Sequence, residues 1–263
     1  MVDYSKIVVL ILSTKDSEYD DFRTAIESTW LQDFKNMGIK CFFYEGGSDI
    51  NKIEGDYIKL KCPDDLCSVS LKLIEALKVV FEKYPETQLV YRTNLSSYID
   101  AKTFLKFIEL NDFSEDTYAG VIGNSYVLKE RLYNYKLLYY FSRFIFFGRK
   151  IQFASGAGFF LGSKHCRTLI SSKINLNLID DVMVAYTINV SPSITAIPER
   201  LSVSLETRHQ FQKKVFLNLV HEKYLFHYRF KTKIRKEDAS LLKLFGDEKF
   251  RESFLSVPMN KYN

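Results

Sequence analysis

The sequence predicts an α/β protein in which a mainly parallel central sheet is flanked by helices. Residues 7–12 (IVVLIL) form a continuous aliphatic run, which is typical of a strand buried on both faces. Strand-like and helix-like segments then alternate as β–α–β–β–α–β over residues 7–92. The 263 residues show no internal repeat, low-complexity tract or flexible linker, so we expect a single domain over 1–263.

The remaining elements follow from side-chain periodicity. Phe22, Ile26, Trp30 and Phe34 are spaced four apart, which indicates one amphipathic helix over 20–34 with Trp30 as a packing residue. Pro85 is expected to end a second helix. Further along the chain we expect strands at 39–44, 56–60 and 88–92, helices at 68–83 and 180–189, and at 152–161 a glycine-containing loop that runs into a strand.

Composition excludes several classes of protein. A hydrophobic content of 46% and a charged content of 26% exclude wholesale disorder. With 37 basic and 32 acidic side chains, the net charge of +5 lacks the strong basic stripe of a nucleic-acid-binding module, although it allows an anionic ligand. The lone pair Cys62 and Cys67 is a poor zinc site, so we expect reduced thiols.

The start of the chain reads as a buried strand rather than a signal peptide. Asp3 lies in the leader, the apolar core is confined to 7–12, and no small-residue cleavage site follows. No apolar run reaches the roughly 18 residues of a membrane span. We therefore expect a cytoplasmic protein without a transmembrane segment.

Ligands of parallel α/β sheets bind beyond the carboxyl ends of the strands. Three segments follow predicted strands and are therefore candidates for a binding site. They are 13–15 (STK), 44–47 (YEGG) and 93–97 (TNLSS).

Four segments in order resemble the β-1,3-galactosyltransferase/Fringe group of inverting glycosyltransferases. Residues 22–30 (FRTAIESTW) are similar to the R-x-x-I-R-x-T-W helix of that group, and residues 89–96 (LVYRTNLS) fall where it has an apolar strand, Lys-Thr and an acidic D-D-D motif. Residues 154–159 (ASGAGF) look like its C-S-G-G-G-Y loop, and 178–182 (LIDDV) like its E/D-D-V motif. The resemblance implies a GT-A (Rossmann-like) fold and an inverting sugar transfer from a nucleotide-sugar donor.

The sequence departs from this group at two places. Glu27 replaces the second Arg of the first motif, and Asn94-Leu95-Ser96 replaces the acidic metal motif. Neutral Asn and Ser are weak ligands for a hard divalent cation and Leu is none. Mn²⁺ or Mg²⁺ therefore stays an open alternative without its usual ligands, and no cofactor and no metal ligand are assigned.

The resemblance implies that Asp181 is the general base that takes the proton of the acceptor hydroxyl. Asp180 would then contact the acceptor or orient the base. The structural alternative is that both acids, which open a predicted helix, only pair with its N-terminus.

The donor diphosphate needs a metal or fixed cations to stabilise its charge. His227, Arg229 and Lys231 alternate, so in an extended segment they share one face that suits a diphosphate, unless they form an ordinary basic surface. Arg23 is implied as a nucleotide contact by the first motif. The expected donor-binding residues are Ser13, Thr14, Lys15, Arg23, Asp56, Arg92, Asn94, Ser96, Ser155, Gly156, His227, Arg229 and Lys231.

The sequence thus predicts a glycosyltransferase with a nucleotide-binding half at about 1–125 and an acceptor half at about 126–263. The expected partners are a UDP-sugar and a lipid-linked or protein-linked glycan acceptor, in a bacterial or viral setting. Two alternatives stay open: an inactive relative that only binds nucleotide sugars, and a metal-independent transferase with a non-UDP donor. The aromatic run 133–147 is either core or an acceptor platform.

Overall fold

The computed structural model describes residues 3–127, 149–176, 178–193, 201–203, 226–230 and 235–255. Two expectations, the phosphate contact of Lys231 and the role of the aromatic run 133–147, lie outside these residues. No helix in the described part of the chain is both long enough and apolar enough to cross a membrane.

The described residues form a large mixed sheet, which confirms the predicted α/β class. Its order is β3-β4-β2-β1-β5-β8-β7, and the central strands β4, β2, β1 and β5 run parallel. The other three strands run antiparallel to their neighbours in this sheet. The strands are β1 (Ile7–Leu12), β2 (Lys40–Glu45), β3 (Lys52–Glu54), β4 (Tyr57–Lys59), β5 (Leu89–Asn94), β7 (Tyr118–Val127) and β8 (Arg149–Gly162).

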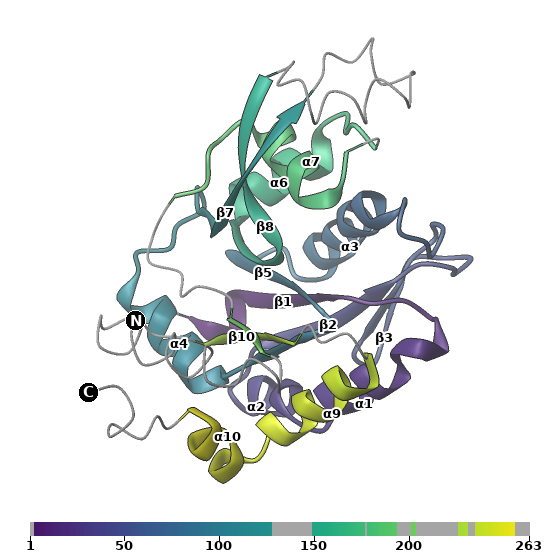
Figure 1. Ribbon diagram of the computed structural model, residues 1–263. Coiled ribbons are helices and arrows are strands. Elements are labelled where there is room, and N and C mark those ends of the chain that lie inside the picture. Colours follow the sequence, from purple (N-terminus) through teal and green to yellow (C-terminus); the bar gives the residue numbers. More distant parts are fainter. Residues whose placement is uncertain are drawn as a thin grey trace.

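Helices cover both faces of this sheet, as Figure 1 shows. Alternate residues of β1 enter two separate cores: Val9 and Ile11 pack with one helical layer, and Val8 and Leu10 with the other. The first layer contains α1 (Asp20–Glu27), α2 (Trp30–Asn36), α4 (Ala101–Leu110), α9 (Arg235–Phe245) and α10 (Glu248–Leu255), and the second contains α3 (Val69–Lys83), α6 (Ser163–Ser171) and α7 (Asp180–Ile188).

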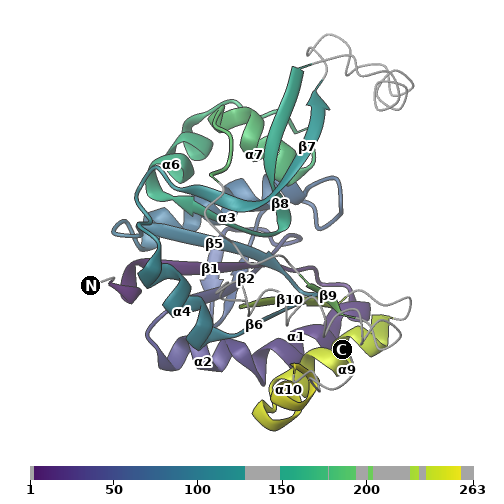
Figure 2. The ribbon, with the colours of Figure 1, turned by 60° about the vertical axis from the view of Figure 1, so that its left-hand side comes forward.

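A second, smaller sheet joins strands from the C-terminal part of the chain to a strand from its first half. Strand β10 (His227–Phe230) pairs antiparallel with β6 (Ser97–Ile99) and parallel with β9 (Leu201–Val203). Helix α9 follows and lies along α1, at the lower edge of the view in Figure 1 and again in Figure 2. The carboxyl end of β5 is therefore flanked by elements from both ends of the sequence.

Two local expectations were wrong. The single helix over 20–34 is divided into α1 and α2, because the hydroxyls of Ser28 and Thr29 donate to main-chain carbonyls of the preceding turn. Residues 152–161 contain no separate loop, since β8 is continuous across them. Trp30 is fully buried, as predicted, and its indole N–H donates to the carbonyl of Ser97 at 3.0 Å. All four cysteines are free.

Candidate active site

A cavity of about 410 Å³ lies at the carboxyl ends of β1 and β5, where the sequence predicts a ligand. Of the predicted residues, Ser13, Thr14, Asn94, Ser96 and Arg229 line it. Its other lining residues are Leu12, Asp16, Glu18, Tyr19, Asp64, Asp65, Leu66, Val69, Lys72, Leu95 and Arg235.

The carboxylate of Asp64 fixes the shape of this cavity. Its Oδ2 accepts hydrogen bonds from Thr14 Oγ1 at 2.9 Å and from the N–H of Lys15 at 2.6 Å. Its Oδ1 accepts from the N–H of Gly46 at 3.1 Å and from Lys72 Nζ at 2.9 Å. Partial burial opposes the charged form, but these hydrogen bonds outweigh it and hold the pKa of Asp64 below its usual value. One carboxylate therefore joins the loops after β1 and β2 to α3.

Arg23 supports the same loop from α1. Its guanidinium donates to the carbonyls of Thr14 and Asp16 and pairs with Asp20. The side chain is buried and does not line the cavity. The predicted nucleotide contact of Arg23 stays a prediction, and in the folded chain its hydrogen bonds go to the protein.

The positions of the acidic metal motif form a closed turn. The Oδ1 atom of Asn94 accepts hydrogen bonds from the N–H of Ser96 at 3.1 Å, from Ser96 Oγ at 2.8 Å and from Ser97 Oγ at 3.2 Å. Leu95 and Ser96 are buried. Three donors on one amide oxygen leave it poorly suited to a metal ion. No cluster of three His, Cys, Asp or Glu side chains suited to a metal occurs in the described ranges, so these residues do not fit the divalent ion that the sequence resemblance implies.

Arg92 lies on β5, two residues before its end, and does not line the cavity. Its Nε donates to the Tyr44 hydroxyl at 3.1 Å and its Nη2 forms an ion pair with Asp180. Burial lowers the pKa of the guanidinium, but Asp180, Tyr44 and Asp181 together outweigh this effect and raise it. Burial also raises the pKa of Tyr44 to about 12, which keeps its hydroxyl neutral. Arg92 is 2% exposed, so in this conformation it holds Asp180 rather than facing the cavity.

Asp181 opens α7 beside this pair and is differently bonded. Its Oδ2 accepts from the N–H of Gly156 at 2.9 Å and its Oδ1 from the N–H of Val182 at 2.9 Å. Among the described residues, no cation lies within ion-pair distance of it. Burial first, and then the neighbouring Asp180, raise the pKa of Asp181. Of the two adjacent carboxylates, Asp180 is thus ion-paired with Arg92, and Asp181 has the raised pKa.

The start of α7 is tied to the wall of the cavity. Ser70 on α3 donates to the carbonyl of Leu178 at 2.9 Å, and the adjacent Val69 lines the cavity. Gly156 lies against the acidic pair: a Cβ there would be 3.1 Å from Arg92 Nη1 and 3.3 Å from Asp181 Oδ2. The predicted G-A-G segment therefore meets the predicted D-D-V segment, with the neighbouring Ser155 partly exposed on β8.

His227 is buried away from the cavity surface. Its Nδ1 is 2.7 Å from the Tyr91 hydroxyl and its Nε2 is 2.7 Å from Ser97 Oγ. Both ring nitrogens are therefore engaged within the protein, whereas Arg229, on the same strand, lines the cavity. Asp56 lies apart from the other predicted residues, because it precedes β4 and pairs with Lys35 at 2.7 Å.

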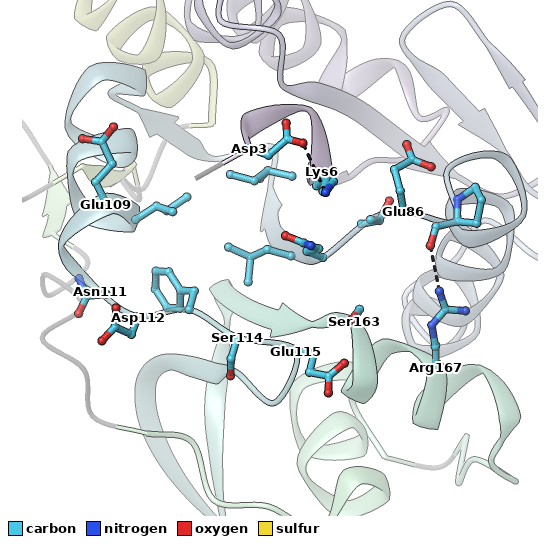
Figure 3. Close-up of a pocket in the computed structure, with 17 residues that line it drawn as sticks. Asp3, Lys6, Glu86, Glu109, Asn111, Asp112, Ser114, Glu115, Ser163 and Arg167 are labelled. Atoms are coloured by element: carbon cyan, nitrogen blue, oxygen red, sulfur yellow. Dashed lines mark hydrogen bonds and ion pairs between the residues drawn. The ribbon is translucent and has the colours of Figure 1, made fainter. Parts of the chain in front are cut away.

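A larger hollow of about 1080 Å³ lies at the opposite, amino ends of β1 and β5 (Figure 3). It contains none of the predicted site residues. Its two cations are engaged: Lys6 pairs with Asp3 at 3.5 Å, and Arg167 donates to the carbonyl of Pro85 at 2.9 Å. Location and chemistry both favour the smaller cavity as the active site.

Sequence reasoning assigned no role to four residues that build the site. Asp64 and Lys72 lie in and after the segment CPDDLC, where only the cysteines drew attention. Tyr44 ends a predicted strand without any motif of its own. Arg235 belongs to the basic stretch that includes His227, but its position depends on α9 packing against α1.

Comparison with known proteins identifies a family for this chain. A family model described as Galactosyltransferase matches residues 21–193. A glycosyltransferase involved in the glycosylation of the major capsid of PBCV-1 has 12% identity and a TM-score of 0.51, over 90% of this chain and 98% of that one. The galactosyltransferase LgtC, solved with donor and acceptor sugar analogs, has 9% identity and a TM-score of 0.44, over 96% and 98%. No curated protein matches the sequence. The first structural similarity confirms the predicted GT-A fold.

Proposed function

The chain belongs to the galactosyltransferase family and is a glycosyltransferase, and from this premise we propose that it transfers a sugar from a UDP-sugar to a glycan hydroxyl with inversion at the anomeric carbon. Asp181 acts as the general base and the cavity beyond β1 and β5 binds the donor. The observation that carries this proposal is the contrast between Asp180, which is paired with Arg92, and Asp181, which is buried with a raised pKa.

The proposed reaction is a direct displacement. The acceptor oxygen attacks the anomeric carbon as the bond to the diphosphate oxygen breaks, and the electron pair of that bond leaves with the diphosphate. The acceptor proton passes to Asp181. A base is more effective when its pKa approaches the working pH, and burial beside Asp180 moves Asp181 in that direction.

Arg92 and Gly156 prepare the base for this step. Arg92 pairs with Asp180, and the Asp180 carboxylate disfavours ionisation of its neighbour and so helps to raise the pKa of Asp181. The Gly156 N–H fixes one oxygen of Asp181. The choice of UDP rests on the family, and a metal-independent reaction with another nucleotide is favoured as the second candidate by the closed turn of Asn94.

A donor screen tests the proposal. The purified chain is melted with UDP-, GDP-, ADP- and CMP-linked sugars, because a bound donor raises the melting temperature by mass action. Release of the nucleotide is then measured, and the anomeric configuration of the sugar product is read by NMR. Stabilisation by a UDP-sugar and a product of inverted configuration are expected. Retained configuration would contradict the mechanism, and donor binding without turnover, even with a panel of glycan acceptors, would identify an inactive relative.

A further inference from the structure

The donor cavity carries its cations on two late elements. Arg229 lies on β10 and Arg235 opens α9, and both line the cavity together with Ser96. The third lining cation, Lys72, is 3% exposed and pairs with Asp64 at 2.9 Å, so its charge is already compensated. Each guanidinium presents several N–H donors in a planar fork, a geometry that suits a multiply charged anion better than the single ammonium of Lys72 does.

Arg235 is held in place by three side chains. Its Nη1 is 3.0 Å from Oδ2 of the fully buried Asp238. Its guanidinium carbon lies 4.7 Å from the ring centre of Phe22 and 5.6 Å from that of Tyr19, which is cation–π geometry. A guanidinium has five N–H donors, so one contact with Asp238 leaves donors for phosphate oxygens. Packing on α1 means that little side-chain entropy is lost when an anion binds.

The carboxylates of the cavity limit how an anion can be attracted. Besides Asp64, the lining includes Asp16, Glu18 and Asp65. Asp16 and Asp65 accept hydrogen bonds from backbone N–H groups of their own turns. These three acids outnumber the two arginines, so a diphosphate would bind by direct guanidinium contacts rather than by a positive field.

We infer that Arg229 and Arg235 bind the donor diphosphate directly and take the place of the divalent ion that the family uses. This inference rests on the proposed donor site and deepens it. The closed turn at Asn94 and the two arginines are complementary observations: the ligands for a metal are missing where the family has them, and cations line the same cavity. The arginines also stabilise the charge that develops on the leaving diphosphate.

Calorimetric titration with nucleoside diphosphates tests the inference in the full chain. UDP, GDP, CDP and ADP are titrated in excess EDTA, and then with Mn²⁺ or Mg²⁺, and each is compared with its free nucleoside. We expect one diphosphate to bind in EDTA, with less than about a twofold gain from metal, and to bind at least about tenfold more tightly than its nucleoside. Equal affinity for nucleoside and diphosphate, or binding only with metal, would overturn the inference.

Substitutions locate the contact. Arg229→Gln and Arg235→Gln should each weaken diphosphate binding about 10- to 100-fold and leave nucleoside binding unchanged. Because Arg235→Gln removes the ion pair with the buried Asp238, Arg235→Lys is included: it keeps a cation beside Asp238 but loses the planar guanidinium, and should still weaken binding. The control is Arg167→Gln at the opposite end of the sheet (Figure 3), which should bind like the parent chain.

The possible results distinguish a failure of this inference from a failure of the proposed transferase function. If the arginine variants fold and bind the diphosphate as tightly as the parent, the inference fails while the transferase proposal stands. If neither a nucleoside diphosphate nor a nucleotide sugar binds with or without metal, the donor site itself is wrong.

Discussion

The main-chain N–H of Gly156 donates to the Oδ2 atom of Asp181 at 2.9 Å, so the backbone of β8 orients the carboxylate at the start of α7. The approach is close, because a Cβ at 156 would lie 3.1, 3.3 and 3.4 Å from Arg92 Nη1, Asp181 Oδ2 and Asp180 Oδ1, so that these side chains would have to shift by a few tenths of an ångström. The proposed base is thus aimed by a strand that lies far from it in the sequence.

Gly156→Ala should lower turnover about tenfold or more while changing the melting temperature little. The added methyl displaces charged groups by a few tenths of an ångström, and catalysis depends on position more steeply than folding does. Steady-state transfer kinetics and thermal melts of both proteins measure the two effects.

Gly158→Ala is the matched comparison on the same strand. Its Cβ would lie 2.3 Å from the Tyr91 hydroxyl and 2.6 Å from His227 Nδ1, inside the core. We expect loss of stability by about 1–3 kcal/mol from overpacking. Equal stability of the two variants would contradict the different roles assigned to the two glycines.

Asp181→Asn should lower the transfer rate by about 10²- to 10⁴-fold and leave donor affinity unchanged, because an amide cannot take the acceptor proton. Single-turnover transfer and donor titration measure the two quantities separately. Near-normal transfer by this variant would remove Asp181 from the mechanism.

As the pH is lowered, the transfer rate should begin to fall at a higher pH than it would if the base were an aspartate of ordinary pKa. Asp181 works deprotonated and burial raises its pKa, so the rate rises with pH through that raised value and then levels. The same shift has a stability consequence: the favourable contribution of protonated Asp181 is present below its unfolded pKa and is lost as pH rises through the folded one. A pH–rate profile checks the first effect, and in Asp181→Asn the acid limb assigned to this residue should disappear from the residual rate.

Arg92→Leu should destabilise the fold by about 3–5 kcal/mol, since it leaves the Asp180 carboxylate without its partner. Asp180→Asn removes the carboxylate that pairs with the buried Arg92 guanidinium and should also lower the stability of the fold. The double variant should be less destabilised than the sum of the two, with a coupling of about 0.5–3 kcal/mol. Urea unfolding of the four proteins measures this cycle, and strict additivity would show that the pair is not coupled.

Local patterns in the sequence were sufficient to predict the elements that depend on local physics. The run 7–12 is the strand β1, and the apolar face of 68–83 is the helix α3. The helix over 20–34 was predicted wrongly, because periodicity does not show that Ser28 and Thr29 bond back to the preceding turn. The order of the motifs predicted that Gly156 and Asp181 belong to one site, and in the structure these two residues share a hydrogen bond.

Contacts between distant segments lay beyond prediction. Arg229 and His227 alternate as expected, yet β10 pairs with β6, and this pairing gives His227 two hydrogen-bond partners inside the protein. Asp64 carries no recognisable motif, and its four donors come from residues that only the fold brings together. Such convergence depends on topology, which single-sequence patterns do not encode.

Strand β10 and helix α9 pack against β6 and α1 from the first half of the chain, and this arrangement affects when the cavity can form during translation. A ribosome releases Ser13, Asp64 and Asn94 long before Arg229 and Arg235, so the nascent chain can form the parallel strands β1, β2 and β5 while the cavity still lacks part of its lining. The full lining of the cavity therefore exists only after residue 235 has left the ribosome, and a chain that stalls before that residue would present an incomplete cavity.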